Sequence, residues 1–175
     1  MLTLGGRLRF SADVFYEKIR NLQVQATRYD PATQGTEYYS TNAGHVTSQG
    51  AEVDFQARPV PALTLSGGIA YVHAYVDTTG LECPLVDQAN ALVSAATPQP
   101  LNVCFLPSAT ATTTDVNVEG GMLPDSPEWS GDLVARYEHV IPNTSLAGFI
   151  QASANYRSAV NFSLNQDPET VQGAY

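Results

Sequence analysis

The sequence predicts an all-β fold of long antiparallel strands, and three observations support this prediction. Apolar and polar residues alternate with a period of two over several stretches, as in strands whose successive side chains point to opposite faces. No stretch approaches the ~20 consecutive apolar residues that a membrane-spanning helix requires. The links between the alternating stretches are short and long in turn.

The clearest alternation lies between residues 49 and 58. One face carries Ala51, Val53, Phe55 and Ala57, and the opposite face carries Glu52, Asp54, Gln56 and Arg58. The Pro-Val-Pro-Ala segment at 59–62 predicts a tight turn, because proline cannot donate to a β-ladder. The run over 63–77 alternates again, with large residues on one face and small ones on the other. The two runs therefore predict an antiparallel hairpin.

Two further pairs of strands follow the same pattern. Residues 128–140 and 146–157 alternate on either side of a predicted turn at 142–145. Near the start, apolar residues at every second position from Leu8 to about Thr27 predict a long strand. We expect a loop tip at 30–36 and a partner strand over 38–58. In total we count about five strands long enough to cross a bilayer.

The lengths of the links are asymmetric. Short turns fall at about 59–62 and 141–145, whereas longer links fall at 28–37, at about 78–126 and after Phe162. Short turns at one end and long loops at the other are typical of outer-membrane barrels. We therefore predict an antiparallel segment of a large transmembrane β-barrel, with its apolar parity toward lipid and its polar parity toward the lumen. The 78–126 link is expected to be a structureless extracellular loop.

Aromatic residues agree with this arrangement. Tyr71, Tyr75 and Trp129 lie near the long-loop ends of their strands, and Tyr137 lies near a short-turn end. These positions fit two interfacial aromatic girdles, in which the polar edge of each ring stays wet. The same residues would also suit the core of a soluble β-sandwich, so that alternative stays open at this point.

Charge and length restrict the function classes. The chain has a net charge of -9 and a single lysine, Lys18, which argues against nucleic-acid binding because neutralising phosphates needs clustered cations. Residues 1–15 show no signal peptide, so either the export signal that a barrel requires lies upstream or the membrane prediction is wrong. Single-chain bacterial barrels need at least about eight strands to close, so the chain is expected to be an incomplete barrel.

Few residues have the pattern of a chemical site. Cys83 and Cys104 both lie in the long link, where an oxidising compartment would favour a disulfide that stabilises by roughly 3 kcal/mol. Free thiols and a metal site are the alternatives, although Cys-x-x-Cys is missing. The histidines His45, His73 and His139 lie on separate segments without metal-binding spacing. Glu52 and Asp54 could act as paired carboxylates, but a wet barrel wall explains them better. The sequence predicts no enzyme, cofactor or metal.

Three stretches resemble the C-terminal half of TonB-dependent receptor barrels. They are Asn42-Ala43-Gly44 with Gln49-Gly50-Ala51-Glu52-Val53-Asp54, then 61–71, and then Leu123-Pro124-Asp125-Ser126-Pro127-Glu128-Trp129-Ser130. Gln49 stands where the family commonly has lysine. Together the stretches cover much of 40–160, and their order and spacing are more specific than any one of them. Neither a plug domain nor a TonB-contacting segment is found, and residues 173–175 resemble the start of another strand.

This resemblance implies a function for the whole of 1–175 as part of a receptor barrel in the bacterial outer membrane. The expected activity is TonB-energised uptake of a scarce nutrient, such as an iron chelate, a cobalamin or an oligosaccharide. The expected partners are outer-membrane lipid, the plug domain and remaining strands of the parent, and TonB through the parent. Glu52, Asp54, Gln56 and Arg58 would face the plug, and the 78–126 loop would capture ligand.

Two other function classes remain open from the sequence. A secreted β-sandwich for adhesion or carbohydrate binding would bury the alternating apolar faces in a dry core. An enzymatic outer-membrane barrel, such as a lipase or a protease, would need a Ser/His or Asp/His pair on its wall. The histidines have the wrong parity for that pair.

Overall fold

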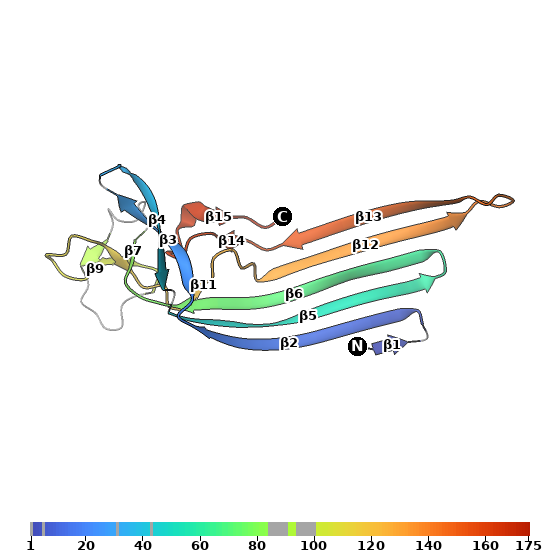
Figure 1. The fold of residues 1–175 in the computed structure, drawn as a ribbon, viewed down its shortest axis with the longest axis horizontal. Coiled ribbons are helices and arrows are strands. Elements are labelled where there is room, and N and C mark those ends of the chain that lie inside the picture. The colour runs from blue at the N-terminus through green and yellow to red at the C-terminus, as the bar shows by residue number, and fades with distance from the viewer. Residues whose placement is uncertain (1, 5, 31, 43, 84–90, 94–100) are drawn as a thin grey trace.

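The computed structural model describes residues 2–4, 6–30, 32–42, 44–83, 91–93 and 101–175. These residues form long antiparallel strands that end in a cluster of shorter elements on one side (Figure 1). The one helical element among them is a 3₁₀ turn, η1, at Pro168–Thr170. No helix in the described ranges is long and apolar enough to cross a membrane. The all-β prediction is therefore confirmed.

One large sheet contains all the long strands. Its order is β1-β2-β5-β6-β12-β13, with every neighbouring pair antiparallel and β11 alongside β6. The strands are β1 Leu2–Leu4, β2 Leu8–Arg20, β5 His45–Val60, β6 Leu63–Asp77, β11 Gly121–Met122, β12 Trp129–Val140 and β13 Ala147–Arg157. Five of them are 11 to 16 residues long, which agrees with the predicted number of long strands.

The two predicted hairpins β5–β6 and β12–β13 are present. The first differs from the prediction at its turn. β5 continues to Val60 after a register shift between Ala57 and Val60, so only Pro61 and Ala62 form the turn. The irregularity lets the strand pass Pro59, which has no N–H to donate.

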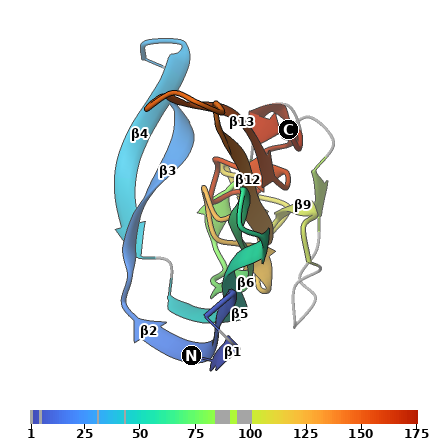
Figure 2. The ribbon, with the colours of Figure 1, turned by 90° about the vertical axis from the view of Figure 1, so that its right-hand side faces the viewer.

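The first predicted strand ends earlier than expected. Asn21 has a left-handed backbone (φ 57°), and its N–H donates to the carbonyl of Gly44, which is also left-handed (φ 69°). The chain then forms a separate ribbon of β3 Gln23–Asp30 and β4 Gly35–Asn42, which turns away from the sheet (Figure 2). The loop tip is thus shorter than the predicted 30–36, and the partner over 38–58 is two strands. Pro31 and Ala43 lie outside the described residues.

The prediction that 78–126 is structureless is wrong for its described part. β7 Leu81–Glu82, β8 Leu92–Val93, β9 Cys104–Leu106 and β10 Asp115–Val116 form a small sheet of order β7-β10-β9-β8. The segment after β13 adds the pair β14 Val160–Asn161 and β15 Val171–Gln172. The stretches 84–90 and 94–100 of this link lie outside the described residues. The apolar residues of this link are far apart in the sequence and come into contact only in the folded chain. They therefore leave no local period from which strands could be predicted.

The buried core lies at this loop end rather than along the sheet. It contains Ala26, Val46, Val76, Leu81, Cys83, Cys104, Val116, Val118 and Leu164. Elsewhere the apolar face of the long sheet is bare: Val14 is 85% exposed and Ile150 is 76% exposed. Within the described ranges no second layer covers that face, which is the opposite of what a β-sandwich requires.

Gly50 is among the glycines that allow a close approach inside the sheet. A Cβ at Gly50 would collide with the backbone carbonyl oxygen of Tyr71 and would lie 2.8 Å from the Phe15 ring. A Cβ at Gly148, in contrast, would meet no atom within 4 Å.

We therefore expect Gly50→Ala to lower the free energy of unfolding by about 2 kcal/mol, because a backbone carbonyl and an aromatic ring must both shift. Urea unfolding of the protein in detergent micelles measures this change. Gly148→Ala is the matched control and should change the free energy of unfolding by less than ~0.5 kcal/mol. Equal effects of the two substitutions would contradict the close packing at Gly50.

Candidate functional site

The polar face of the sheet forms a continuous wall. Register pairs Asp13 with Glu52, and it places Gly68 between Asp54 and Asp132 in the neighbouring row. Gln56 and Arg58 share the parity of Glu52, so the four predicted lumen-facing residues lie on one face. Their position toward a lumen remains a prediction, because the sheet is open.

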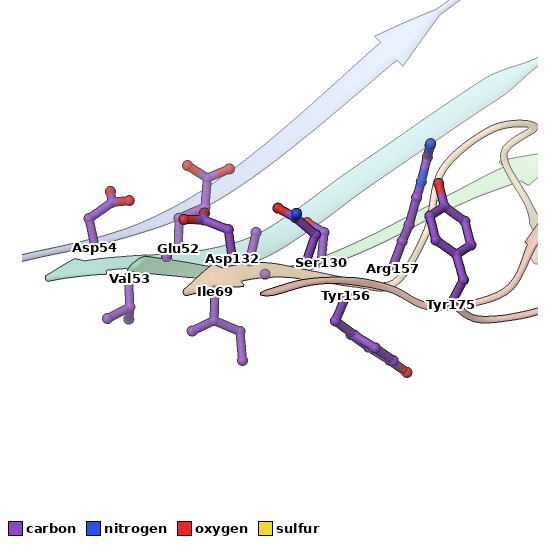
Figure 3. Close-up of a pocket in the computed structure, with 13 residues that line it drawn as sticks. Glu52, Val53, Asp54, Ile69, Ser130, Asp132, Tyr156, Arg157 and Tyr175 are labelled. Atoms are coloured by element: carbon purple, nitrogen blue, oxygen red, sulfur yellow. The ribbon is translucent and has the colours of Figure 1, made fainter. Parts of the chain in front are cut away.

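A shallow hollow of about 460 Å³ lies on this wall. Figure 3 shows Glu52, Asp54 and Asp132 on one side of the sheet with Ser130, Arg157 and Tyr175, whereas Val53, Ile69 and Tyr156 project from the other side. Gly68 provides the space, since a Cβ there would lie 2.8 Å from Asp54 Oδ1 and 3.6 Å from Asp132 Oδ1. Two carboxylates therefore converge above a backbone position without a side chain.

Electrostatics limit what this wall can do. Like charges that face one another across strands are unfavourable unless water or a cationic group lies between them. Among the described residues no group of three or more His, Cys, Asp or Glu side chains could hold a metal ion. The converging carboxylates therefore make this part of the wall locally anionic.

The apolar face carries the predicted aromatic residues. The rings of Tyr71 and Trp129 are in contact, with centroids 4.8 Å apart, and Tyr75 lies further along β6 on the same parity. Tyr137 is opposite Leu63 at the other end of the sheet. Tyr71 and Trp129 therefore share one row, Tyr75 lies four residues further along β6, and Tyr137 lies toward the opposite end of the same face. Their position at membrane interfaces remains a prediction.

The histidines do not form a common site. Nδ1 of His73 lies 3.0 Å from a carboxylate oxygen of Glu128, and its ring contacts that of Tyr75. His45 begins β5 at the loop end, whereas His139 is opposite Gly148 near the turn at the other end. Each therefore has a local environment of its own.

The short elements at the loop end form a single cap, which we define as residues 21–44, 78–123 and 158–172, taken over their described parts. Leu164 is fully buried in the shared core, and Gln166 Nε2 donates to the carbonyl of Met122. The Asn165 side chain donates to the carbonyl of Glu82. Cys83 and Cys104 form a disulfide with their Cα atoms 5.7 Å apart.

The cap lies against the polar side of the sheet. Val46 and Val76 belong to the parity of the wall, yet both are fully buried in the cap core. The wall thus becomes apolar at its loop end because the cap covers it there. This change of character along one face is a feature that the sequence analysis did not predict.

Two carboxyl groups and one phenol in the cap have shifted pKa values. Burial raises the pKa of the Asp115 carboxyl. Burial also raises the pKa of the Tyr39 phenol, and the carboxylate of Glu82 adds to that shift. The backbone N–H of Ala32 and the hydroxyl of Thr33 donate to Asp30 and lower the pKa of its carboxyl.

Comparisons with known proteins identify the class of protein. The model of the family described as "TonB dependent receptor-like, beta-barrel" matches residues 2–175, so the chain belongs to that family. Members of this family are transport receptors of the Gram-negative outer membrane and not enzymes. No curated protein matches the chain.

A solved structure shows the same fold. The chain is similar to the crystal structure of the siderophore receptor PiuA from Acinetobacter baumannii, with a TM-score of 0.59 and 18% identity. The match covers 99% of this chain and 19% of that receptor, so the chain spans about a fifth of the receptor's length.

The four lumen-facing residues named from the sequence all belong to one strand, β5. Asp13 and Asp132 come from strands far apart in the chain, and only the register brings them to Glu52 and Asp54. Their parity was visible in the sequence, whereas the register was not.

The disulfide generates a testable prediction. C83S/C104S should lower the local stability of the cap by about 3 kcal/mol, because the bond closes a loop with a sequence separation of 21. Hydrogen exchange of the β9 and β10 amides should therefore become faster, while exchange in β5 and β6 stays unchanged. Reduced wild-type protein is the control and should match the variant. Equal exchange in the oxidised, reduced and substituted proteins would contradict a stabilising role.

Proposed function

We propose that this chain forms part of the barrel wall and the external ligand-capturing cap of an outer-membrane receptor for a scarce nutrient. The observation that carries the proposal is the two-sided sheet, whose apolar face is bare and whose polar face is charged. A bare apolar face of this length suits lipid, since nothing else compensates for its exposure to water. The uptake is energised by TonB through the parent receptor.

The candidate ligands are an iron chelate, a cobalamin and an oligosaccharide. The similarity to a protein described as a siderophore receptor favours testing an iron chelate first. At 18% identity that similarity supports the fold alone, so the ligand class remains part of the proposal.

The cap is proposed to capture ligand before transport. It lies on the wall side of the sheet at the long-loop end, which is the extracellular end in outer-membrane barrels. The link at 107–113 is the most suitable part to alter, because it connects the antiparallel strands β9 and β10 and is mostly exposed. Replacing it leaves the buried core of the cap in place.

We expect a receptor in which Asn-Gly replaces 107–113 to take up its ligand several-fold more slowly, with an unchanged amount of receptor in the outer membrane. Cells that depend on the receptor are supplied with a ferric chelate, cyanocobalamin or a malto-oligosaccharide, and uptake is measured for each. A matched Asn-Gly replacement of the turn at 142–145, at the opposite end of the sheet, is the control. Uptake that is unaffected by the 107–113 replacement would refute the capture role.

The wall is proposed to face the plug domain of the parent receptor. Four carboxylates, from Asp13, Glu52, Asp54 and Asp132, occupy adjoining rows on it. Each exposed ion pair with a basic plug side chain would contribute little alone, but a group of converging carboxylates makes a stronger field.

We expect E52Q/D54N to change uptake several-fold without altering ligand binding at the cell surface, because the variant removes charge beside the plug and not in the cap. Transport and surface binding are measured on the same cells. E119Q/E169Q removes two exposed carboxylates from the cap and is the matched control for charge. Loss of surface binding with E52Q/D54N, or wild-type transport, would count against a wall that faces the plug.

A further inference from the structure

A polar notch interrupts the apolar face at its loop end. It has a volume of about 380 Å³ and is lined by Lys18, Arg20, His45, Thr47, Tyr75 and Asp77. Register confirms that these residues share one face. Arg20 is opposite His45, which is opposite Asp77, and the neighbouring row runs from Lys18 through Thr47 to Tyr75.

The notch lies directly beyond the apolar row of β2. That row consists of Leu8, Phe10, Ala12, Val14 and Tyr16, and the next two residues of the same parity are Lys18 and Arg20. From Leu8 to Lys18 the strand rises about 34 Å at ~3.4 Å per residue, which is about 26 Å along the barrel axis at a strand tilt of ~40°. The apolar band of an outer-membrane barrel is about 25 Å tall. The two cations therefore stand where the hydrocarbon ends and lipid headgroups begin.

Cations are scarce in this chain, which makes their placement informative. The protein has 8 Lys and Arg against 17 Asp and Glu, and Lys18 is its single lysine. Lys18 Nζ lies 5.9 Å from the centroid of the Tyr16 ring. Within the described part of the chain neither Lys18 nor Arg20 forms an ion pair. Among the described residues, Asp77 is the one carboxylate that lines the notch, where Lys18 and Arg20 supply two permanent cations.

The notch also contains hydroxyl donors. Thr47 is only 7% exposed although its side chain is polar, and across the described ranges its hydroxyl has no hydrogen-bond partner. Tyr75 adds a phenol from the neighbouring strand. An ammonium, a guanidinium and hydroxyl groups around one hollow match the oxygens of a phosphate, which accept several charge-assisted hydrogen bonds.

We propose that this notch binds the phosphate of an anionic lipid headgroup in the outer leaflet. The inference rests on the proposed function, because that function places the bare face in the membrane and the cap outside. A lipid suits the surface better than free phosphate does, since its acyl chains would cover the apolar face next to the notch. That face also carries a groove of about 480 Å³ whose apolar lining includes Ile69, Trp129, Leu133 and Tyr156.

Native mass spectrometry of the full-length receptor in detergent tests the proposal, with diphosphoryl lipid A as the probe. The wild-type receptor should retain bound lipid, and K18Q/R20Q should bind it roughly tenfold more weakly, because each cation near an anionic lipid surface favours binding. R7Q/R9Q removes two cations near the other end of β2, one just before the strand and one within it, and should bind as the wild type does. The same lipid without its phosphates should show the weakened binding with every variant.

Three results would overturn the proposal. They are wild-type binding by K18Q/R20Q, an equal loss with R7Q/R9Q, and equal binding of the dephosphorylated lipid. Competition by millimolar inorganic phosphate as effective as by the lipid would show that the notch is a site for free phosphate, which also contradicts the proposal. Insertion of each variant into phosphatidylcholine vesicles is measured in parallel. Failure of the wild-type receptor to insert would refute the proposed function, whereas insertion without lipid A binding would refute only the notch.

Discussion

The structure depends on the requirement that every backbone polar group of a membrane-crossing strand has a partner. Lipid offers no hydrogen bonds, so each long strand must pair along its whole length with a neighbour on either side. β5 and β6 satisfy this requirement through a ladder that runs from the turn to the loop end. The alternation of faces follows from the same ladder, because a paired strand cannot rotate its side chains independently. Position in the sheet thus assigns each residue to the apolar face or to the wall.

The cap begins at the loop end, where the pairing of the long strands ends. At Asn21 and Gly44 the left-handed backbone releases the chain from the sheet, and the polypeptide forms a separate ribbon. Val46 and Val76 then serve a second role as the base of the cap core. A single face is therefore charged over most of its length and apolar under the cap. The proposed division of function, with capture in the cap and contact with the plug on the wall, follows this change in chemistry.

The two charged regions of the sheet occur on opposite faces. The carboxylates of the wall gather over small residues such as Gly68. Lys18 and Arg20 instead lie on the apolar face, just beyond the apolar row of β2. A net charge of -9 would give no hint of this separation. This separation of charge underlies both proposals, contact of the wall with the plug and contact of the notch with a phosphate headgroup.

The sequence by itself determined the all-β class, both long hairpins, the faces of Glu52, Asp54, Gln56 and Arg58, and the asymmetry of the links. These features are local, because a period of two and a proline turn can be read within one segment. Only the tertiary structure decided the break at Asn21, the folding of the cap and the pairing of Asp13 with Glu52. The alternation of apolar and polar residues continues past Asn21 in the sequence, although the strand ends before it. Register and core formation depend on contacts between distant segments, and no local pattern records which partner each segment will meet.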